Sequence, residues 1–417
     1  MSEGAIAHLL APGKPKLSSE APSSLAAPPA PLLRRRKICL QSLPSDKCDP
    51  IRRAAALELA DMEDNHAEAD EENGQHGPQG PRISAVRLAL RNFTSQWFLV
   101  PQGTGALAVL LHQLAYQFTG LTIISQCVWV LTIIMLVSML LLYLARLTLF
   151  PAHVAKLLRT NIMETACLAS SSIAYTTIIQ MTALNLVSTW GTPWGMVVYV
   201  LWWVDLVMAC SACVGIVYVF VGMEACGIDL VPVAIRLPPI ATLTVAAGGG
   251  VICRYGELAP GLQVPVILMS YLCVGGGLLL ALMCDAAFLV RLFDQAWPKG
   301  RKIYSIMIAC GPYGQASFAM QILGDVVKRG AFAGPDTSKF ISPGDERIVA
   351  VCSTLIAILL WGYGTFWWSF ACISVVHDSL YNTRDLLRWD RNLGAWSLVF
   401  PWVCSTAEYL PTQHFDF

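Results

Sequence analysis

The sequence predicts an all-α protein that crosses a membrane several times. Hydrophobic residues make up 55% of its 417 residues and charged residues only 13%, and the mean hydropathy is +0.55. A soluble protein of this length carries about twice as much charge. Apolar runs of about 20 residues, the length of a membrane helix, follow one another after residue 91 with short connections. The net charge is zero, which gives no indication of a nucleic-acid partner.

The first 90 residues differ in composition from the rest. They are rich in Pro, Ala and Ser, with a basic run at residues 34–37 and an acidic segment at residues 61–72. Such a segment buries too little apolar surface to fold alone. We therefore expect a disordered cytosolic tail over residues 1–90 and a transmembrane domain over residues 91–417.

Nine spans are expected in the transmembrane domain. Each is a predominantly apolar run, and the short connections favour antiparallel neighbours. The ninth is the weakest, because the sequence becomes polar soon after Pro401. In order, the spans are predicted near residues 94–113, 121–145, 166–188, 197–221, 235–253, 264–290, 303–324, 348–376 and 394–410.

Pro and Gly interrupt most of the odd-numbered spans, whereas the second span runs unbroken. Backbone groups freed by Pro or Gly inside a bilayer need partners in protein or in a water-filled cavity. We therefore expect the odd-numbered spans to face inward and line a pathway, and the even-numbered spans to face lipid. The interruptions are residues 101–105, Pro238 with Pro239, residues 248–250, residues 311–315, and Phe400 with Pro401.

Cations in the connections predict the orientation. Lys and Arg follow spans two, six and eight, and none follows spans one and three. The connection after span seven is an exception, since it carries cations together with acidic residues. Because cytoplasmic loops are enriched in Lys and Arg, we expect a cytosolic N-terminus.

Small and uncharged polar residues in the odd-numbered spans are candidates for the lining of the pathway. Hydroxyls and amides can pass an anion through repeated weak contacts without trapping it. The alternative is that these groups hydrogen-bond between helices, as they often do in membranes. The candidates are Gly103, Thr104, Gly105, Thr176, Gln180, Gly248, Gly249, Gly311, Gly314, Gln315 and Phe318.

Two carboxyl groups, Asp205 and Asp285, lie in even-numbered spans. Asp205 is a candidate for proton coupling, because buried carboxylates can carry protons; the alternatives are an interhelical hydrogen bond and a position near the membrane surface. Cys210 and Cys213 are one helical turn apart without a nearby His, so we expect apolar packing rather than a metal site. Nucleotide-binding, zinc and nucleophile motifs do not occur. We therefore expect neither enzyme activity nor a cofactor.

Several segments resemble the tellurite-resistance/dicarboxylate transporter family, which includes fungal sulfite efflux pumps, fungal malate transporters and the plant slow anion channel. Each segment is short, but their order and spacing match over residues 91 to about 402. The segments are residues 91–94 with Trp97 and Phe98, residues 103–106, Arg146 with Phe150 and Pro151, Trp190 with Gly191, residues 201–205, Arg291 with Trp297, and residues 311–315 with Phe318.

The resemblance implies five helical hairpins, with odd-numbered helices around a central pore, even-numbered helices outside them, and a homotrimer with one pore in each subunit. Phe400, just before Pro401, matches the phenylalanine that plugs the pore in channel members. Two departures stand out. Residues 159–161 and 170–172 replace a His-Pro start and a helix-three proline, and the polar sequence after Pro401 predicts an incomplete helix nine and no helix ten.

The function that the resemblance implies is transport of small anions across the plasma membrane, most similar to sulfite efflux. Two alternatives remain open: a C4-dicarboxylate (malate) transporter of the same fold, and a truncated membrane protein that does not transport. The expected partners are a small inorganic or organic anion and the lipid bilayer.

Overall fold

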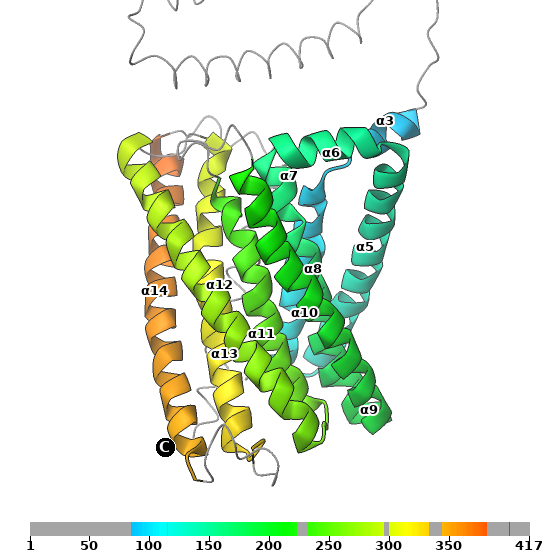
Figure 1. Cartoon of the computed structure of the whole chain (residues 1–417), viewed down its shortest axis with the longest axis vertical. Coiled ribbons are helices and arrows are strands. Elements are labelled where there is room, and N and C mark those ends of the chain that lie inside the picture. The colour runs from blue at the N-terminus through cyan, green and yellow to red at the C-terminus, as the bar shows by residue number, and fades with distance from the viewer. Residues whose placement is uncertain are drawn as a thin grey trace, which may run out of the picture. The chain divides into compact units, whose positions relative to one another are not determined.

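The computed structural model describes residues 85–114, 116–222, 232–295, 300–332, 344–381 and 400. Within these ranges all regular structure is helical, which confirms the predicted fold class. Long helices lie side by side and run between the two ends of a bundle (Figure 1). The tail over residues 1–84, and the ninth span apart from Phe400, lie outside the described residues.

The predicted odd-numbered spans one, three, five and seven form a continuous inner row. The segments α4, α8, α11 and α13 contact one another in that order. The first and fifth spans begin with a 3-10 turn of four residues, and the seventh begins with a 3-10 helix of 11 residues. The segments are η2 (Ser95–Phe98) with α4 (Leu99–Gln113); α7 (Ile162–Cys167), α8 (Ala169–Thr182), η3 (Ala183–Val187) and α9 (Ser188–Trp190); η5 (Val233–Arg236) with α11 (Leu237–Tyr255); and η6 (Gly300–Cys310) with α13 (Gly311–Lys328).

The even-numbered spans lie outside this row. They are α5 (Leu121–Leu149), α10 (Thr192–Val221), α12 (Pro260–Gln295) and α14 (Glu346–Tyr381). In their most apolar stretches only 17%, 28%, 39% and 28% of residues are buried, against 67% and 94% for the third and fifth spans. Apolar side chains that no protein covers belong in lipid, so the division into inner and outer helices is confirmed for these spans.

Six of the eight described segments are long and apolar enough to cross a membrane by themselves. The first and seventh segments are not long and apolar enough by themselves. The helix α4 has only 15 residues, and α13 carries many polar and small side chains. Both are nevertheless held in the inner row by contacts with their neighbours. The chain is therefore an integral, multi-pass membrane protein in which some helices depend on the others.

In the first, fifth and seventh spans the predicted interruptions do not break the helices, so this expectation was wrong there; Pro401 of the ninth span lies outside the described residues. The helix α4 continues through residues 101–105 and α11 through residues 248–250. Pro238 and Pro312 lie in the first turns of α11 and α13, where a helix does not use the backbone N–H. These prolines start helices instead of breaking them.

The clearest irregularity is η3, a π-helical segment with neither Pro nor Gly. Asn185 within it donates to the carbonyl of Met181 at 2.9 Å and accepts from Gln126 Nε2 of α5 at 3.0 Å. Because π-bulges often occur at functional sites, this segment joins the candidate residues of the third span.

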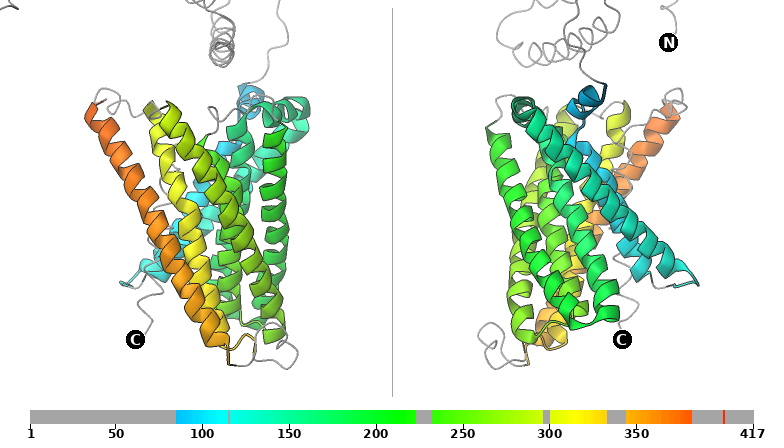
Figure 2. Two further views of the ribbon diagram at one scale, coloured as in Figure 1. Left: turned by 60° about the vertical axis from the view of Figure 1, so that its left-hand side comes forward. Right: turned by 90° about the vertical axis from the view of Figure 1, so that its right-hand side faces the viewer.

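Two short helices, α3 (Ala85–Arg91) and α6 (Pro151–Thr160), lie at the same end of the bundle in both views of Figure 2. Residues 85–90 were predicted as part of the disordered tail, but they are helical, because Ala, Leu and Arg favour helix. In α6, Val154 is fully buried and Lys156 and Arg159 are exposed. The helix α6 is therefore amphipathic and lies across the ends of the long helices (Figure 1).

Candidate functional site: the interior of the helix bundle

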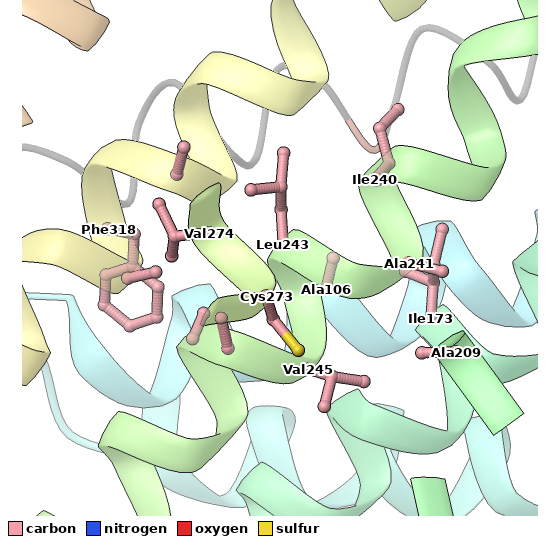
Figure 3. Close-up of a cluster of buried hydrophobic side chains, with 14 of the residues drawn as sticks. Ala106, Ile173, Ala209, Ile240, Ala241, Leu243, Val245, Cys273, Val274 and Phe318 are labelled. Atoms are coloured by element: carbon pink, nitrogen blue, oxygen red, sulfur yellow. The ribbon is translucent and has the colours of Figure 1, made fainter. Parts of the chain in front are cut away.

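The inner helices meet in one buried hydrophobic cluster. Ala106 of α4, Ile173 of α8, Val245 of α11 and Phe318 of α13 all contribute to it (Figure 3). The predicted pathway residues are distributed along these same helices. The structure therefore places them inside the bundle, but different residues among them contact different neighbouring helices.

The glycines of α11 let neighbouring helices approach closely. A Cβ atom on Gly248 would lie 2.7 Å from Thr176 Cγ2 and 3.7 Å from Gln180 Nε2 of α8. On Gly249 it would overlap Ser270 Oγ of α12 and lie 3.0 Å from the ring of Trp202. The structure thus brings Thr176, Gln180 and Gly248 together, while Gly249 faces the outer helices.

The residues of the first span face α5 and α8. Thr104 Oγ1 lies 3.3 Å from the hydroxyl of Thr132 on α5, and a Cβ on Gly105 would overlap Thr177 of α8. Hydrogen bonding between helices, the alternative weighed for these residues, is thus observed for Thr104. Gly103 is also buried.

Asp205 lies in the interior with no exposed surface. It is on α10, and it accepts hydrogen bonds from Ser172 Oγ at 2.8 Å and from Thr176 Oγ1 at 2.5 Å, both on α8. Among the described residues, both donors to this carboxyl group are hydroxyls and neither is a cation. The interhelical hydrogen bond expected as one alternative is present.

The beginning of α13 places Gly311 beside Phe400. A Cβ on Gly311 would lie 3.8 Å from the ring of Phe400 and 3.4 Å from Ile240 of α11. Phe400 is only 4% exposed, so its ring fills space between the starts of α11 and α13. Gly314 is buried nearby along the helix, and Gln315 is partly buried.

Three inner helices carry a buried polar atom that has no hydrogen-bond partner within the described part of the chain. These are Gln102 Oε1 on α4, Ser170 Oγ on α8 and Gln321 Oε1 on α13. Buried polar atoms are usually satisfied, so each is available to a ligand or a water. Gln102 and Ser170 were not among the predicted pathway residues, although each lies in a segment that the sequence analysis noted, residues 101–105 and 170–172.

Sequence reasoning also missed a buried ion pair near the start of α11. Arg236 donates from Nε to Asp285 of α12 at 2.5 Å, and the Tyr313 hydroxyl of α13 donates to the same carboxylate. The guanidinium lies over the rings of Phe288 and Trp367, 4.7 and 5.4 Å from their centroids. An Arg at the start of one apolar span with an Asp inside the next was the signal that could have revealed it.

A second buried cluster joins the first three spans. Arg146 at the end of α5 donates to Glu164 of α7 at 2.5 Å, and Glu164 accepts from the backbone N–H of Ser95 at 3.0 Å. Arg146 was counted among the loop cations, yet it is 1% exposed. Each cluster pairs one cation with one anion, so neither adds net charge to the interior.

Comparison with known proteins decides the family. The family model described as voltage-dependent anion channel matches residues 92–410, which is most of the chain and nearly the range over which the sequence resemblance was found. The chain belongs to the voltage-dependent anion channel family. The predicted relationship to transporters of small anions is confirmed by this match.

The curated relatives of this family member carry two kinds of name. A sulfite efflux pump of Arthroderma benhamiae is 28% identical over 75% of this chain and 80% of its own length. One of Arthroderma otae is 29% identical with the same coverage. A malic acid transport protein of Schizosaccharomyces pombe is 21% identical over 75% of this chain and 68% of its own length.

Proposed function

We propose that this family member exports sulfite across the plasma membrane. The observation that carries the proposal is the similarity to sulfite efflux pumps, which at 28% and 29% identity exceeds the 21% to a malic acid transport protein. Transport of a C4-dicarboxylate is the second candidate, because that relative matches over the same share of the chain.

The proposed pathway runs between the inner helices α4, α8, α11 and α13. Its chemistry suits an anion that must pass without being held. Gln102, Ser170 and Gln321 offer uncharged polar groups, and the buried cations Arg146 and Arg236 are each paired with a carboxylate. A lining whose described buried cations are each neutralised by a carboxylate binds an anion weakly enough to release it.

The proposal includes a cytosolic N-terminus and a homotrimer. The exposed Lys156 and Arg159 of α6 lie at the end of the bundle where α3 begins, and such cations are enriched on the cytoplasmic side. Removal of a tag near residue 10 by protease added to intact cells would contradict this orientation. A single-subunit mass in detergent would contradict the trimer.

Flux in reconstituted vesicles tests the substrate. We expect the purified protein to accelerate sulfite release and to be inhibited by excess external sulfite more strongly than by malate, because the sulfite relatives share more of its sequence. The control uses vesicles of the same lipid composition that contain the inner-helix variant Gly311→Leu. Faster malate than sulfite release would favour the dicarboxylate function, and no release of either anion would indicate a protein that does not transport.

Proton coupling through Asp205 is a separate part of the proposal. Asp205→Asn keeps a side chain of the same shape, and the hydroxyls of Ser172 and Thr176 can turn to accept from its amide. We expect this variant to fold and to carry sulfite at a rate that no longer responds to a proton gradient, because Asn cannot take up a proton. Sulfite flux that keeps its full response to the gradient would exclude Asp205 from coupling.

A further inference from the structure

A pocket of about 500 Å³ opens beside the elbow where α5 turns into α6, away from the inner helices. Its polar lining is cationic or titratable: Arg87 and Arg91 of α3, and His153 of α6. Its apolar lining comes from the end of α5 and the start of α6, including Leu149 and Phe150. The proposed transport function does not use this pocket.

The two arginines are held in place but remain available. They are four residues apart on α3, so they share one face of that helix. The guanidinium of Arg87 lies over the ring of Phe150, 5.6 Å from its centroid, and the carbonyl of Arg91 accepts from Arg146 Nε at 3.1 Å. Among the described residues, neither Arg87 nor Arg91 forms an ion pair.

The electrostatic environment of the pocket is positive. Arg146 beneath it is already neutralised by Glu164, while Lys156 and Arg159 on α6 add exposed cations close by. Partial burial, and then the charges of Arg91, Arg146 and Lys156, lower the pKa of the His153 imidazole. Three cations therefore act on His153 against one carboxylate, that of Glu164, and such an excess of positive charge favours an anion.

The position of the pocket indicates which anion it receives. The lipid-facing side of α5 exposes Leu142, which is two turns before Leu149 of the pocket wall and on the same face of the helix. The helix α6 lies across the end of the bundle (Figure 1), at the depth where an amphipathic helix meets lipid headgroups. A ligand here would have an anionic head and an apolar tail.

We propose that this pocket binds the headgroup of an anionic phospholipid, with its phosphate between Arg87 and Arg91 and an acyl chain along α5. The cations of α3 and α6 are on the side proposed to be cytosolic, and the cytoplasmic leaflet is the one rich in anionic lipid. The bound lipid would fix α3 and α6 against the end of the transport domain.

Lipid retained by the purified full-length protein tests the proposal. The protein is reconstituted in a mixture of phosphatidylcholine and phosphatidylserine, extracted in detergent, and the lipid that stays bound is measured by native mass spectrometry. We expect phosphatidylserine to be retained in preference to phosphatidylcholine. The double variant Arg87→Gln and Arg91→Gln should retain it roughly 30-fold less, since each basic residue at an anionic surface contributes a factor of about five.

The matched control removes two cations from α6 that do not line the pocket, in the double variant Lys156→Gln and Arg159→Gln. Because these two cations do not line the pocket, this control should lose clearly less retained phosphatidylserine than the Arg87 and Arg91 double variant. Equal losses in the two double variants, or no preference for phosphatidylserine in the unmodified protein, would overturn the proposal. Displacement of the lipid by millimolar inorganic phosphate or sulfite would also overturn it, because it would identify a site for small anions. Sulfite flux in pure phosphatidylcholine is measured in parallel, so failure of the lipid site is distinguished from failure of the transport function.

Discussion

Asp285→Ala is expected to remove most of the folded protein, with a loss of about 3–5 kcal/mol in the free energy of unfolding. The substitution leaves Arg236, which has no exposed surface, buried without a counter-charge, and breaking a buried pair from one side costs about that much. It also removes the acceptor of the Tyr313 hydroxyl. Thermal unfolding of the purified protein, together with the amount extracted from membranes, measures the effect.

Two comparisons make this prediction specific. Asp325→Ala breaks an ion pair with Arg254 in which both side chains are partly exposed, so it should cost at most about 1 kcal/mol. The double variant Arg236→Met and Asp285→Leu replaces the buried charges by apolar groups of similar size and should recover stability. Equal losses for Asp285→Ala and Asp325→Ala would show that the buried pair has no special role.

Phe400→Ala is expected to increase anion leak through the protein while its amount in the membrane stays unchanged. The ring lies beside Gly311 at the start of α13, and a large apolar side chain at a constriction closes a narrow pore by its bulk and by excluding water. The measurement is sulfite leak from vesicles at equal protein content. A smaller side chain should therefore give a larger leak.

The competing role for Phe400 is packing, because the ring belongs to the buried hydrophobic cluster. Phe288→Ala provides the control, since Phe288 is 1% exposed and lies under the guanidinium of Arg236. That variant should lose stability, typically about 3–5 kcal/mol for a buried phenylalanine, without gaining leak. If Phe400→Ala behaves like Phe288→Ala, Phe400 is a core residue and the gate lies elsewhere.

The division into inner and outer helices could be predicted because it depends on composition along whole spans. A long unbroken apolar run, such as that of α5, predicts a helix that faces lipid. In the most apolar stretch of α5, 17% of the residues are buried, against 94% in the fifth span, which agrees with the predicted contrast. The local effect of the prolines was predicted wrongly. A proline in an apolar run looks the same in the sequence whether it starts a helix or interrupts one. For Pro238 and Pro312, only the helix boundaries in the structure distinguish these two cases.

The contacts within the candidate site could not be predicted from the sequence, for a different reason. The pairing of Arg236 with Asp285, or of Asp205 with Thr176, depends on which faces of two helices meet. The rotation of each helix about its axis is set by packing, including the glycines of α11, and not by any local pattern. Sequence reasoning could therefore name Asp205 and Thr176 separately but not bring them together.

The buried pair of Arg236 and Asp285 also constrains the order in which the chain can be assembled in the membrane. Arg236 precedes its partner by 49 residues, so during synthesis it reaches the bilayer well before the carboxylate that neutralises it. A charge at that depth is costly while it is alone. We therefore expect the nascent fifth helix to stay at the insertion machinery until the sixth arrives, so that the two enter the lipid as one hairpin. Chains arrested just before and just after Asp285 should differ in crosslinking to that machinery.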